Sequence, residues 1–120
     1  MQGFERLQAW RVCHQLAVTL HKTTRDFPRD ERYELTSQIR RAAYSAAANI
    51  AEGSAKRGTR EFARYLNISL GSLAELAYAL MLARDAEVID HDSWRELETL
   101  RGRAGYLTWR LYRAISRGTR

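Results

Sequence analysis

Histidine and carboxylate residues are the first candidates for chemistry in this chain of 120 residues. A di-metal site in a helical bundle requires Glu-x-x-His pairs that point inward. None of His14, His21 and His91 has an acidic residue three positions before it. His14 and His21 are seven residues apart and fall on one helix face, but two lone histidines are more typical of a surface than of a metal site. We therefore predict no metal ligand and no cofactor.

Nucleophiles and phosphate-binding glycines are the second group of candidates. The segment Gly53 to Thr59 has the glycine spacing of a phosphate loop, but Thr59 stands where the motif requires Lys, and no strand precedes it. Ser45 and Ser72 have no histidine base nearby in the sequence. Cys13 falls in an apolar stripe, which favours a small buried side chain over a reactive thiol. The sequence indicates no catalytic constellation, and we expect a non-enzymatic protein.

Four stretches of helical periodicity must position these residues. Apolar side chains recur at alternating spacings of three and four residues, as one helix face requires, and Pro28 is the single proline. The pattern predicts an all-α protein with helices over residues 4–26, 36–56, 60–86 and 91–116. The predicted inner stripes are Ala9, Cys13, Leu16 and Leu20; Ile39, Ala43, Ala46, Ile50 and Gly53; Phe62, Leu66, Ser69, Leu73, Leu76, Leu80 and Ala83; and Leu97, Leu100, Ala104, Leu107, Leu111 and Ile115.

The caps and connections predict how these helices are arranged. Thr36, Thr59 and either Asp90 or Asp92 are suitable N-caps for the second, third and fourth helices. Short connections place sequential neighbours antiparallel. We predict one domain, residues 1–120, folded as an up-down-up-down antiparallel four-helix bundle.

Charge is segregated along the chain, whose formal net charge is +6. Residues 38–64 carry six basic and two acidic groups, a balance of +4, and residues 95–120 carry seven and two, a balance of +5. Residues 65–94 carry one basic and five acidic groups, a balance of −4, and residues 1–37 add the remaining +1. An up-down bundle converts this segregation along the chain into segregation between its two ends.

The predicted basic end is where the first helix begins, the second and third helices connect and the fourth helix ends. Six residues there are candidate nucleic-acid ligands: Lys56, Arg57, Arg60, Arg64, Arg113 and Arg117. Helix dipoles do not explain Arg60 and Arg64, which open a helix at its positive end. Binding of an RNA or DNA backbone and a merely solvated basic surface are equal alternatives. The opposite end is expected to be acidic, with Asp26, Asp30, Glu31, Glu34, Asp85, Glu87, Asp90 and Asp92.

The second predicted helix has unusually small side chains. Six alanines between residues 42 and 51 cover nearly every direction around its axis, so a neighbouring backbone can approach on two sides. One side serves the core. We predict that the other side meets another subunit, where polar side chains need partners once they are buried. The expected contact residues are Ala47, Ala48, Asn49 and Glu52. Alanine as a plain helix former on a solvated face is an equal alternative.

The fourth predicted helix carries an aromatic stripe beside its core stripe. Trp94, Gly105, Trp109 and Tyr112 share this side of the helix. Gly105 weakens a helix interior by about 1 kcal/mol relative to Ala, and a close packing contact would account for it. We predict that Trp109 and Tyr112 belong to a subunit interface. The alternative is that the aromatic residues widen the core of the bundle itself.

Five motifs carry a family resemblance over most of the chain. They are Phe27-Pro28, Leu35-Thr36-Ser37-Gln38, Arg40-Arg41-Ala42-Ala43, Asn49-Ile50-Ala51-Glu52-Gly53 and Gly71-Ser72-Leu73-Ala74-Glu75-Leu76. Together they resemble the four-helix-bundle proteins encoded in intervening sequences of bacterial 23S ribosomal RNA genes. Family members often carry Pro where this chain has Ala47 and Gly where it has Glu34.

The resemblance implies a cytosolic four-helix bundle that assembles into a homopentameric ring and whose function is not established. A distantly similar accessory protein of diversity-generating retroelements is also a pentameric bundle and binds nucleic acid. The N-terminus lacks the apolar core of a signal peptide, and no run approaches the ~20 apolar residues of a membrane span. We expect a cytoplasmic protein with no membrane contact. Its leading function is binding of a nucleic-acid backbone, and the alternative is a structural or protein-partner scaffold without a nucleic-acid ligand.

Overall fold

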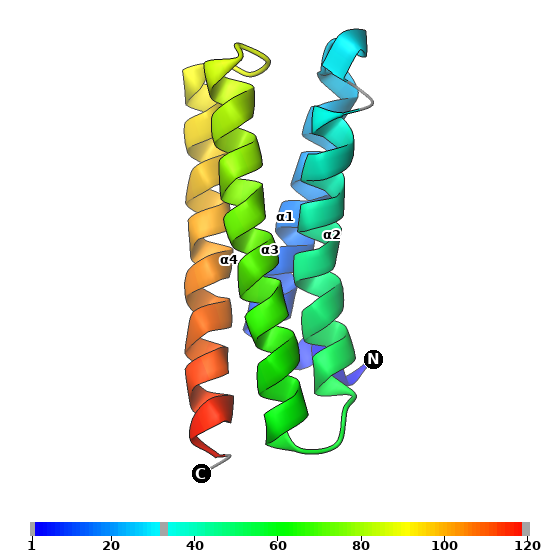
Figure 1. The fold of residues 1–120 in the computed structure, drawn as a ribbon, viewed down its shortest axis with the longest axis vertical. Helices are drawn as coiled ribbons and strands as arrows, with labels where there is room; N and C mark the ends of the chain where they lie inside the picture. The colour runs from blue at the N-terminus through cyan, green and yellow to red at the C-terminus, as the bar shows by residue number, and fades with distance from the viewer. Residues whose placement is uncertain (1, 32–33, 119–120) are drawn as a thin grey trace.

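The structure is a computed structural model that describes residues 2–31 and 34–118. Within these residues it contains four long α-helices and no strand, so the predicted all-α class is confirmed (Figure 1). The helices are α1 (Gln8–Thr23), α2 (Leu35–Ser54), α3 (Thr59–Asp85) and α4 (His91–Arg117). Short 3-10 turns precede α1 (Gly3–Arg6) and follow it (Thr24–Asp26 and Arg29–Glu31).

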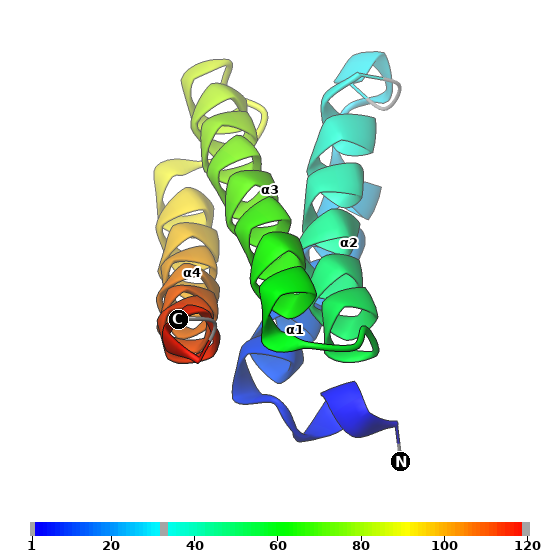
Figure 2. The same ribbon diagram turned by 60° about the horizontal axis from the view of Figure 1, so that its bottom comes forward.

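The helices form an antiparallel up-down-up-down bundle, as predicted. Each helix packs on its neighbour in the chain, and α4 returns to pack on α1, which closes the bundle. The bundle is elongated, with extents of 47 × 22 × 21 Å. The N-terminal segment, the α2–α3 connection and the end of α4 lie at one end, and the other two connections lie at the opposite end (Figures 1 and 2).

The core follows the predicted apolar stripes. The largest fully buried aliphatic side chains are Leu16, Leu20, Ile39, Ile50, Leu66, Leu73, Leu76 and Leu80. From α4 the buried residues are Leu97, Ala104 and Thr108, whereas Leu100, Leu107, Leu111 and Ile115 are only partly buried. The apolar stripe of α4 is therefore less deeply buried in the core than its periodicity predicts.

Two helix starts differ from the prediction. The first helix begins at Gln8 and not near residue 4, because Gly3–Arg6 forms a 3-10 turn and Leu7 is extended (φ −81°, ψ 122°). The second helix begins at Leu35, so Thr36 lies inside it and is not its cap. The Thr36 side chain is buried, and its hydroxyl has no hydrogen-bond partner among the described residues.

The two later caps come closer to expectation. Gly58, with φ 87°, precedes the first residue of α3, so the predicted cap Thr59 is one position too late. Glycine adopts this left-handed φ without the steric cost of a Cβ. Asp90 caps α4 as predicted, because its carboxylate accepts a hydrogen bond of 2.7 Å from the Ser93 amide.

The small side chains of α2 allow a close approach to α3 within one chain. Ser69 of α3 donates a 2.7 Å hydrogen bond to the Ala46 carbonyl of α2, and the hydroxyls of Ser45 and Ser72 lie 2.7 Å apart. A Cβ added to Gly53 would lie 2.6 Å from the Cβ of Tyr65. On one side of α2, the small side chains therefore allow close packing against α3 within the same bundle.

The third helix is apolar enough to pass a test of length and composition for a membrane span. Its mean hydropathy reaches 1.4 over eighteen residues, and 44% of that window is buried in the bundle. Such a helix is weak evidence, because the core helix of a globular protein passes the same test. Since α3 packs along both α2 and α4, we describe it as a core helix of a globular bundle.

Candidate functional site

The basic end is assembled from the α2–α3 connection and the two helix ends beside it. Lys56 and Arg57 lie in the connection, and Arg60 and Arg64 lie in the first two turns of α3. The end of α4 comes close, since a Cβ added to Gly118 would lie 3.8 Å from Cγ2 of Thr59. The fold thus brings Arg117 beside the start of α3, as the sequence predicts. Arg113 lies one turn before Arg117 in α4.

The carboxylates at this end are already engaged. Glu5 accepts a hydrogen bond from the Gln2 amide, Glu52 lies 3.9 Å from the Lys56 ammonium, and Glu61 lies 3.2 Å from the Arg64 guanidinium. The hydrogen bond from Arg64 lowers the pKa of Glu61. These carboxylates neutralise some of the charge that Lys56 and Arg64 contribute.

The remaining candidate arginines have no carboxylate partner among the described residues. Arg57, Arg60, Arg113 and Arg117 are exposed, and none forms an ion pair with another residue in the described part of the chain. Exposed guanidinium groups of this kind are available to phosphate oxygens, which they bind in a bidentate geometry. These four side chains are the strongest part of the predicted set.

Aromatic rings at the basic end are covered by cations. The Arg64 guanidinium lies 4.7 Å from the centroid of the Tyr65 ring, and the Lys56 ammonium lies 5.5 Å from it. The Arg113 guanidinium lies 5.1 Å from the centroid of the Trp109 ring. Tyr65 was not predicted as part of the basic end because it lies in the second turn of α3, beyond the α2–α3 connection. The two cations take positions over the ring that a stacking base would otherwise use.

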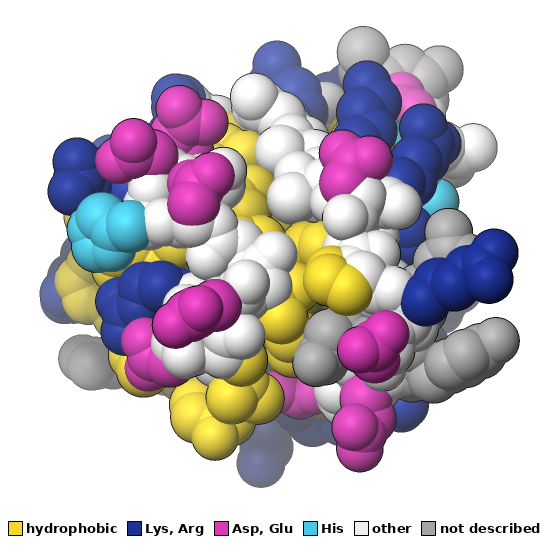
Figure 3. Space-filling view, turned by 90° about the horizontal axis from the view of Figure 1, so that it is seen from above, with side chains coloured by type: hydrophobic (Ala, Val, Ile, Leu, Met, Phe, Trp, Pro, Cys, Tyr) yellow, Lys and Arg dark blue, Asp and Glu magenta, His cyan; other side chains and the backbone are white. Residues whose placement is uncertain are grey.

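The opposite end is less uniform than its carboxylates alone predict. Seen from above, this end shows both acidic and basic side chains (Figure 3). Lys22, Arg25 and Arg29 are exposed there, near the end of α1 and in the segment that follows. The two ends differ in charge, but the upper end is a mixture and not an acidic surface.

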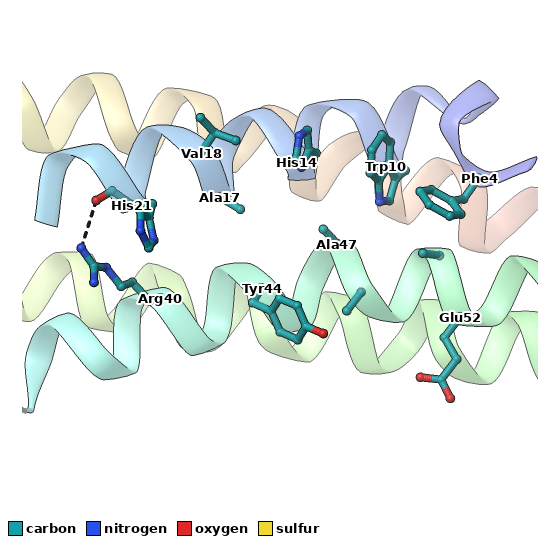
Figure 4. Close-up of a pocket in the computed structure, with 12 residues that line it drawn as sticks. Phe4, Trp10, His14, Ala17, Val18, His21, Arg40, Tyr44, Ala47 and Glu52 are labelled. Carbon is teal, nitrogen blue, oxygen red and sulfur yellow. Dashed lines mark hydrogen bonds between the residues drawn. The ribbon is translucent and has the colours of Figure 1, made fainter. Parts of the chain in front are cut away.

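An open apolar groove of about 750 Å³ lies between α1 and α2 (Figure 4). Ala47, Ala48 and Glu52, three of the predicted interface residues, line it from α2. Asn49 does not line the groove, since its amide donates to the carbonyl (2.8 Å) and the hydroxyl (3.0 Å) of Ser45. The predicted interface face of α2 is therefore divided, with Asn49 on the side that packs on α3.

The groove also has a wall from α1 that the sequence did not reveal. The Trp10 and His14 rings stack there, with centroids 4.9 Å apart and 6° between their planes, and Phe4 meets Trp10 edge to face. At the other end of the groove, Arg40 donates to the His21 carbonyl at 3.1 Å (Figure 4). The spacing of Trp10 and His14, one turn apart on α1, was the available signal.

The aromatic stripe of α4 separates into two parts. Trp94 and Tyr112 pack against the core, and Arg84 of α3 lies 4.3 Å from the Trp94 ring. These two residues widen the core of the bundle, which was the alternative interpretation. Trp109 is 44% exposed, and only the Arg101 side chain comes within 4 Å of a Cβ built at Gly105. No close contact among the described residues of the bundle accounts for Gly105.

Arg40 of the family motif ties two helices together. Its Nε donates to the Thr24 hydroxyl at 2.8 Å, and its Nη2 satisfies the His21 carbonyl in the last turn of α1. The Thr24 hydroxyl in turn donates to the Leu20 carbonyl. We assign Arg40 to the α1–α2 junction and not to a ligand site.

Burial and local contacts account for the other chemical candidates, Cys13, Ser45 and Ser72. Cys13 is fully buried, and burial raises the pKa of its thiol to about 11, although its hydrogen bond with Thr108 acts in the opposite direction. The part of the chain that the structure describes contains no group of three or more metal-ligating side chains. Ser45 and Ser72 contact each other and serve the α2–α3 seam.

Residues 5–105 match the 23S rRNA-intervening sequence protein family. The chain belongs to this family. The predicted resemblance is thereby confirmed over most of the sequence, and Arg40, Asn49 and Gly53 are motif residues whose contacts inside the bundle are described above. No match was found among curated protein sequences.

A solved structure supports the same fold. It is the crystal structure of a protein with unknown function from the S23 ribosomal protein family of Bacteroides thetaiotaomicron VPI-5482. The two chains share 21% sequence identity with a TM-score of 0.79, over 88% of this chain and 95% of the other. At this identity the likeness shows the fold alone. Neither the family nor the solved relative is assigned an enzymatic activity by its description.

Proposed function

We propose that this family member is a non-enzymatic, self-associating bundle that binds the backbone of RNA or DNA through its basic end. The observation that carries the proposal is a set of exposed guanidinium groups at that end without carboxylate partners in the described part of the chain: Arg57, Arg60, Arg113 and Arg117. The cytoplasm is the compartment we expect for such a protein.

The start of α3 adds to this positive surface. The first four amides of a helix have no partner within it, and the helix dipole places a partial positive charge there. Gly58 and Thr59 open α3 between Arg57 and Arg60. A phosphate at this end therefore meets both backbone donors and guanidinium groups.

Backbone contacts without base stacking predict weak sequence preference. The ring of Tyr65 is covered by Arg64 and Lys56, and stacking on aromatic faces is what strengthens single-strand binding by other proteins. One subunit should bind weakly. A closed ring, a pentamer by family resemblance, would repeat the basic end and raise the affinity through effective concentration.

Fluorescence anisotropy with labelled RNA and DNA over a salt series tests the proposal. Log affinity should fall linearly with log salt, by about 0.9 per phosphate neutralised on duplex DNA and about 0.7 on single strands. The variant Arg57→Glu, Arg60→Glu, Arg117→Glu should lose binding. The matched control Lys22→Glu, Arg25→Glu, Arg29→Glu makes the same charge change at the upper end and should bind nearly as the natural protein does.

Two outcomes would reject nucleic-acid binding. The first is that the natural protein does not bind nucleic acid at low salt. The second is that both triple variants lose the same amount of affinity, which would indicate that binding depends on net charge and not on a site. The second candidate function, a structural or protein-partner scaffold, would then take its place. The apolar groove between α1 and α2 favours this alternative, since a groove of this kind needs an occupant.

A further inference from the structure

The groove between α1 and α2 is shaped for an aromatic occupant. Its floor is formed by alanines of α2, which leave depth between the helices, and its walls include the Trp10 and His14 stack and Tyr44. Tyr44 is 72% exposed at its edge. Apolar walls with a few polar groups at the ends are typical of sites that bury large side chains.

The outer side of α4 carries an exposed aromatic pair. Tyr106 is 57% exposed and Trp109 is 44% exposed. Their rings stack with centroids 6.4 Å apart. Arg110 lies over Tyr106, and Arg113 lies over Trp109. We call Tyr106 and Trp109 the aromatic pair. Trp, Tyr and Arg are enriched among the residues that contribute most to binding at protein interfaces.

The groove and the aromatic pair face away from each other within one bundle. Leu107 and Leu111 of α4 line the junction with Leu7 and Ala9, at the start of α1. Trp109 is two residues from either leucine, which turns it about 200° around the helix axis. It therefore points away from α1. A bundle cannot fill its own groove, but it can offer the aromatic pair to a second copy.

The two surfaces also lie at the same height along the bundle. The Cys13 sulfur and the Thr108 hydroxyl are 3.6 Å apart, so these positions of α1 and α4 are level. At a rise of 1.5 Å per residue, Trp10 and Trp109 differ in height by about 3 Å. Contact between surfaces at equal heights needs little translation along the bundle axis, which is what a closed ring of copies requires.

Charge complements the apolar fit. Glu52 lines the groove and is exposed, with the Lys56 ammonium as its ion-pair partner in the described residues at 3.9 Å. Arg110 and Arg113 flank the aromatic pair and form no ion pair with a described carboxylate. An arriving α4 therefore brings Arg110, which is not among the proposed phosphate ligands, toward a carboxylate at the groove.

From these observations we propose that the α1–α2 groove of one copy receives the aromatic pair of a second copy. This inference rests on the self-association proposed above and names the surfaces that meet. The contact is heterologous, because the surface that receives differs from the surface that inserts. Each copy in the assembly therefore has one groove filled and one aromatic pair inserted.

Cross-linking between singly labelled copies tests the pairing directly. One sample carries Ala48→Cys in the groove and another carries Tyr106→Cys, and the two are mixed and treated with a short bis-maleimide. Cys13 is fully buried in both. We expect cross-links between the two variants and none within either sample alone. A mixture of Ala48→Cys with Tyr78→Cys, which places the thiol on the exposed side of α3, is the matched control and should not cross-link.

A dilution series followed by light scattering measures the contribution of the aromatic pair. Changing Trp109 to Ala should raise the concentration of half-assembly about 30-fold or more, as for a central interface residue. Tyr78→Ala removes an aromatic side chain of α3 that is 64% exposed and should leave assembly unchanged.

The failures of the two proposals are distinguishable. A natural protein that is monomeric at every concentration rejects both the self-association and the groove contact. An assembled protein that cross-links only through paired Ala48→Cys copies, or not at all between positions 48 and 106, retains self-association and rejects the groove contact. An unchanged assembly in the Trp109→Ala variant rejects it as well.

Discussion

Gly53 and Gly71 both lie within helices, yet alanine should have opposite effects at the two positions. A Cβ at Gly53 would meet the Tyr65 Cβ at 2.6 Å and the Phe62 Cδ1 at 3.1 Å. The Tyr65 Cβ is fixed to the backbone of α3, so the contact is relieved only if the two helices move apart. No described atom lies within 4 Å of a Cβ built at Gly71.

The expected magnitudes follow from two opposing effects. Alanine is favoured over glycine in a helix interior by about 1 kcal/mol, which should stabilise the Gly71→Ala variant by nearly that amount. An extra methyl in a tightly packed contact costs about 1–3 kcal/mol. For Gly53→Ala this cost offsets the helix preference, which is reduced near the end of α2, and the net change should be a destabilisation of about 0–2 kcal/mol. The two variants should therefore differ by about 1–3 kcal/mol.

Urea denaturation followed by far-ultraviolet circular dichroism measures this difference. All variants must be compared at the same protein concentration, because self-association couples to unfolding. Gly102→Ala, at another helix position with no described atom within 4 Å, is an additional control and should behave like Gly71→Ala. If Gly53→Ala stabilises the protein as much as Gly71→Ala does, the close approach of α2 and α3 is refuted.

Two further predictions concern Arg40, which is half-buried, and Cys13, which is fully buried. Arg40→Met removes the hydrogen bonds to Thr24 and His21 and should destabilise the bundle by about 1–3 kcal/mol in the same urea assay. The control Arg41→Met alters an exposed neighbour and should change the free energy of unfolding by less than about 0.5 kcal/mol. Burial raises the pKa of Cys13 from 9.0 to about 11, so its contribution is complete below pH 9 and is lost as the pH rises through 11. Relative to Cys13→Val, the natural protein should lose roughly 3 kcal/mol of stability over that range; equal pH dependence of the two proteins, or fast thiol modification of the native state, would contradict this.

The sequence predicts the helices and their buried faces because periodicity reports which side of a helix avoids water. Leu16, Ile50 and Leu76 are buried where their spacing placed them, and Asp90 caps α4 because its carboxylate reaches an amide nearby in the chain. Such features depend on a few neighbouring residues and can therefore be predicted without knowledge of the fold.

Features that depend on a distant partner were not predictable in the same way. Gly53 owes its role to Tyr65 on the next helix, and a lone glycine near a helix end also fits a simple terminus. The outer side of α4 was predicted from Trp109, but periodicity did not single out Tyr106 as its exposed neighbour. For the basic end, topology placed the arginines together, whereas the ion pairs of Lys56 and Arg64 depend on side-chain conformations.

The α1–α4 junction has a consequence for how the protein is made. Cys13 and Thr108 meet across 95 positions of the chain, so the apolar face of α1 lacks one of its two neighbours until α4 has been synthesised. At elongation rates of about 5–20 residues per second, this interval lasts roughly 5–20 s. During it, the nascent chain can pair α1 with α2 and α2 with α3, but it exposes the surface that α4 will cover. A ribosome that stalls before position 108 would therefore hold a three-helix intermediate with an open apolar side.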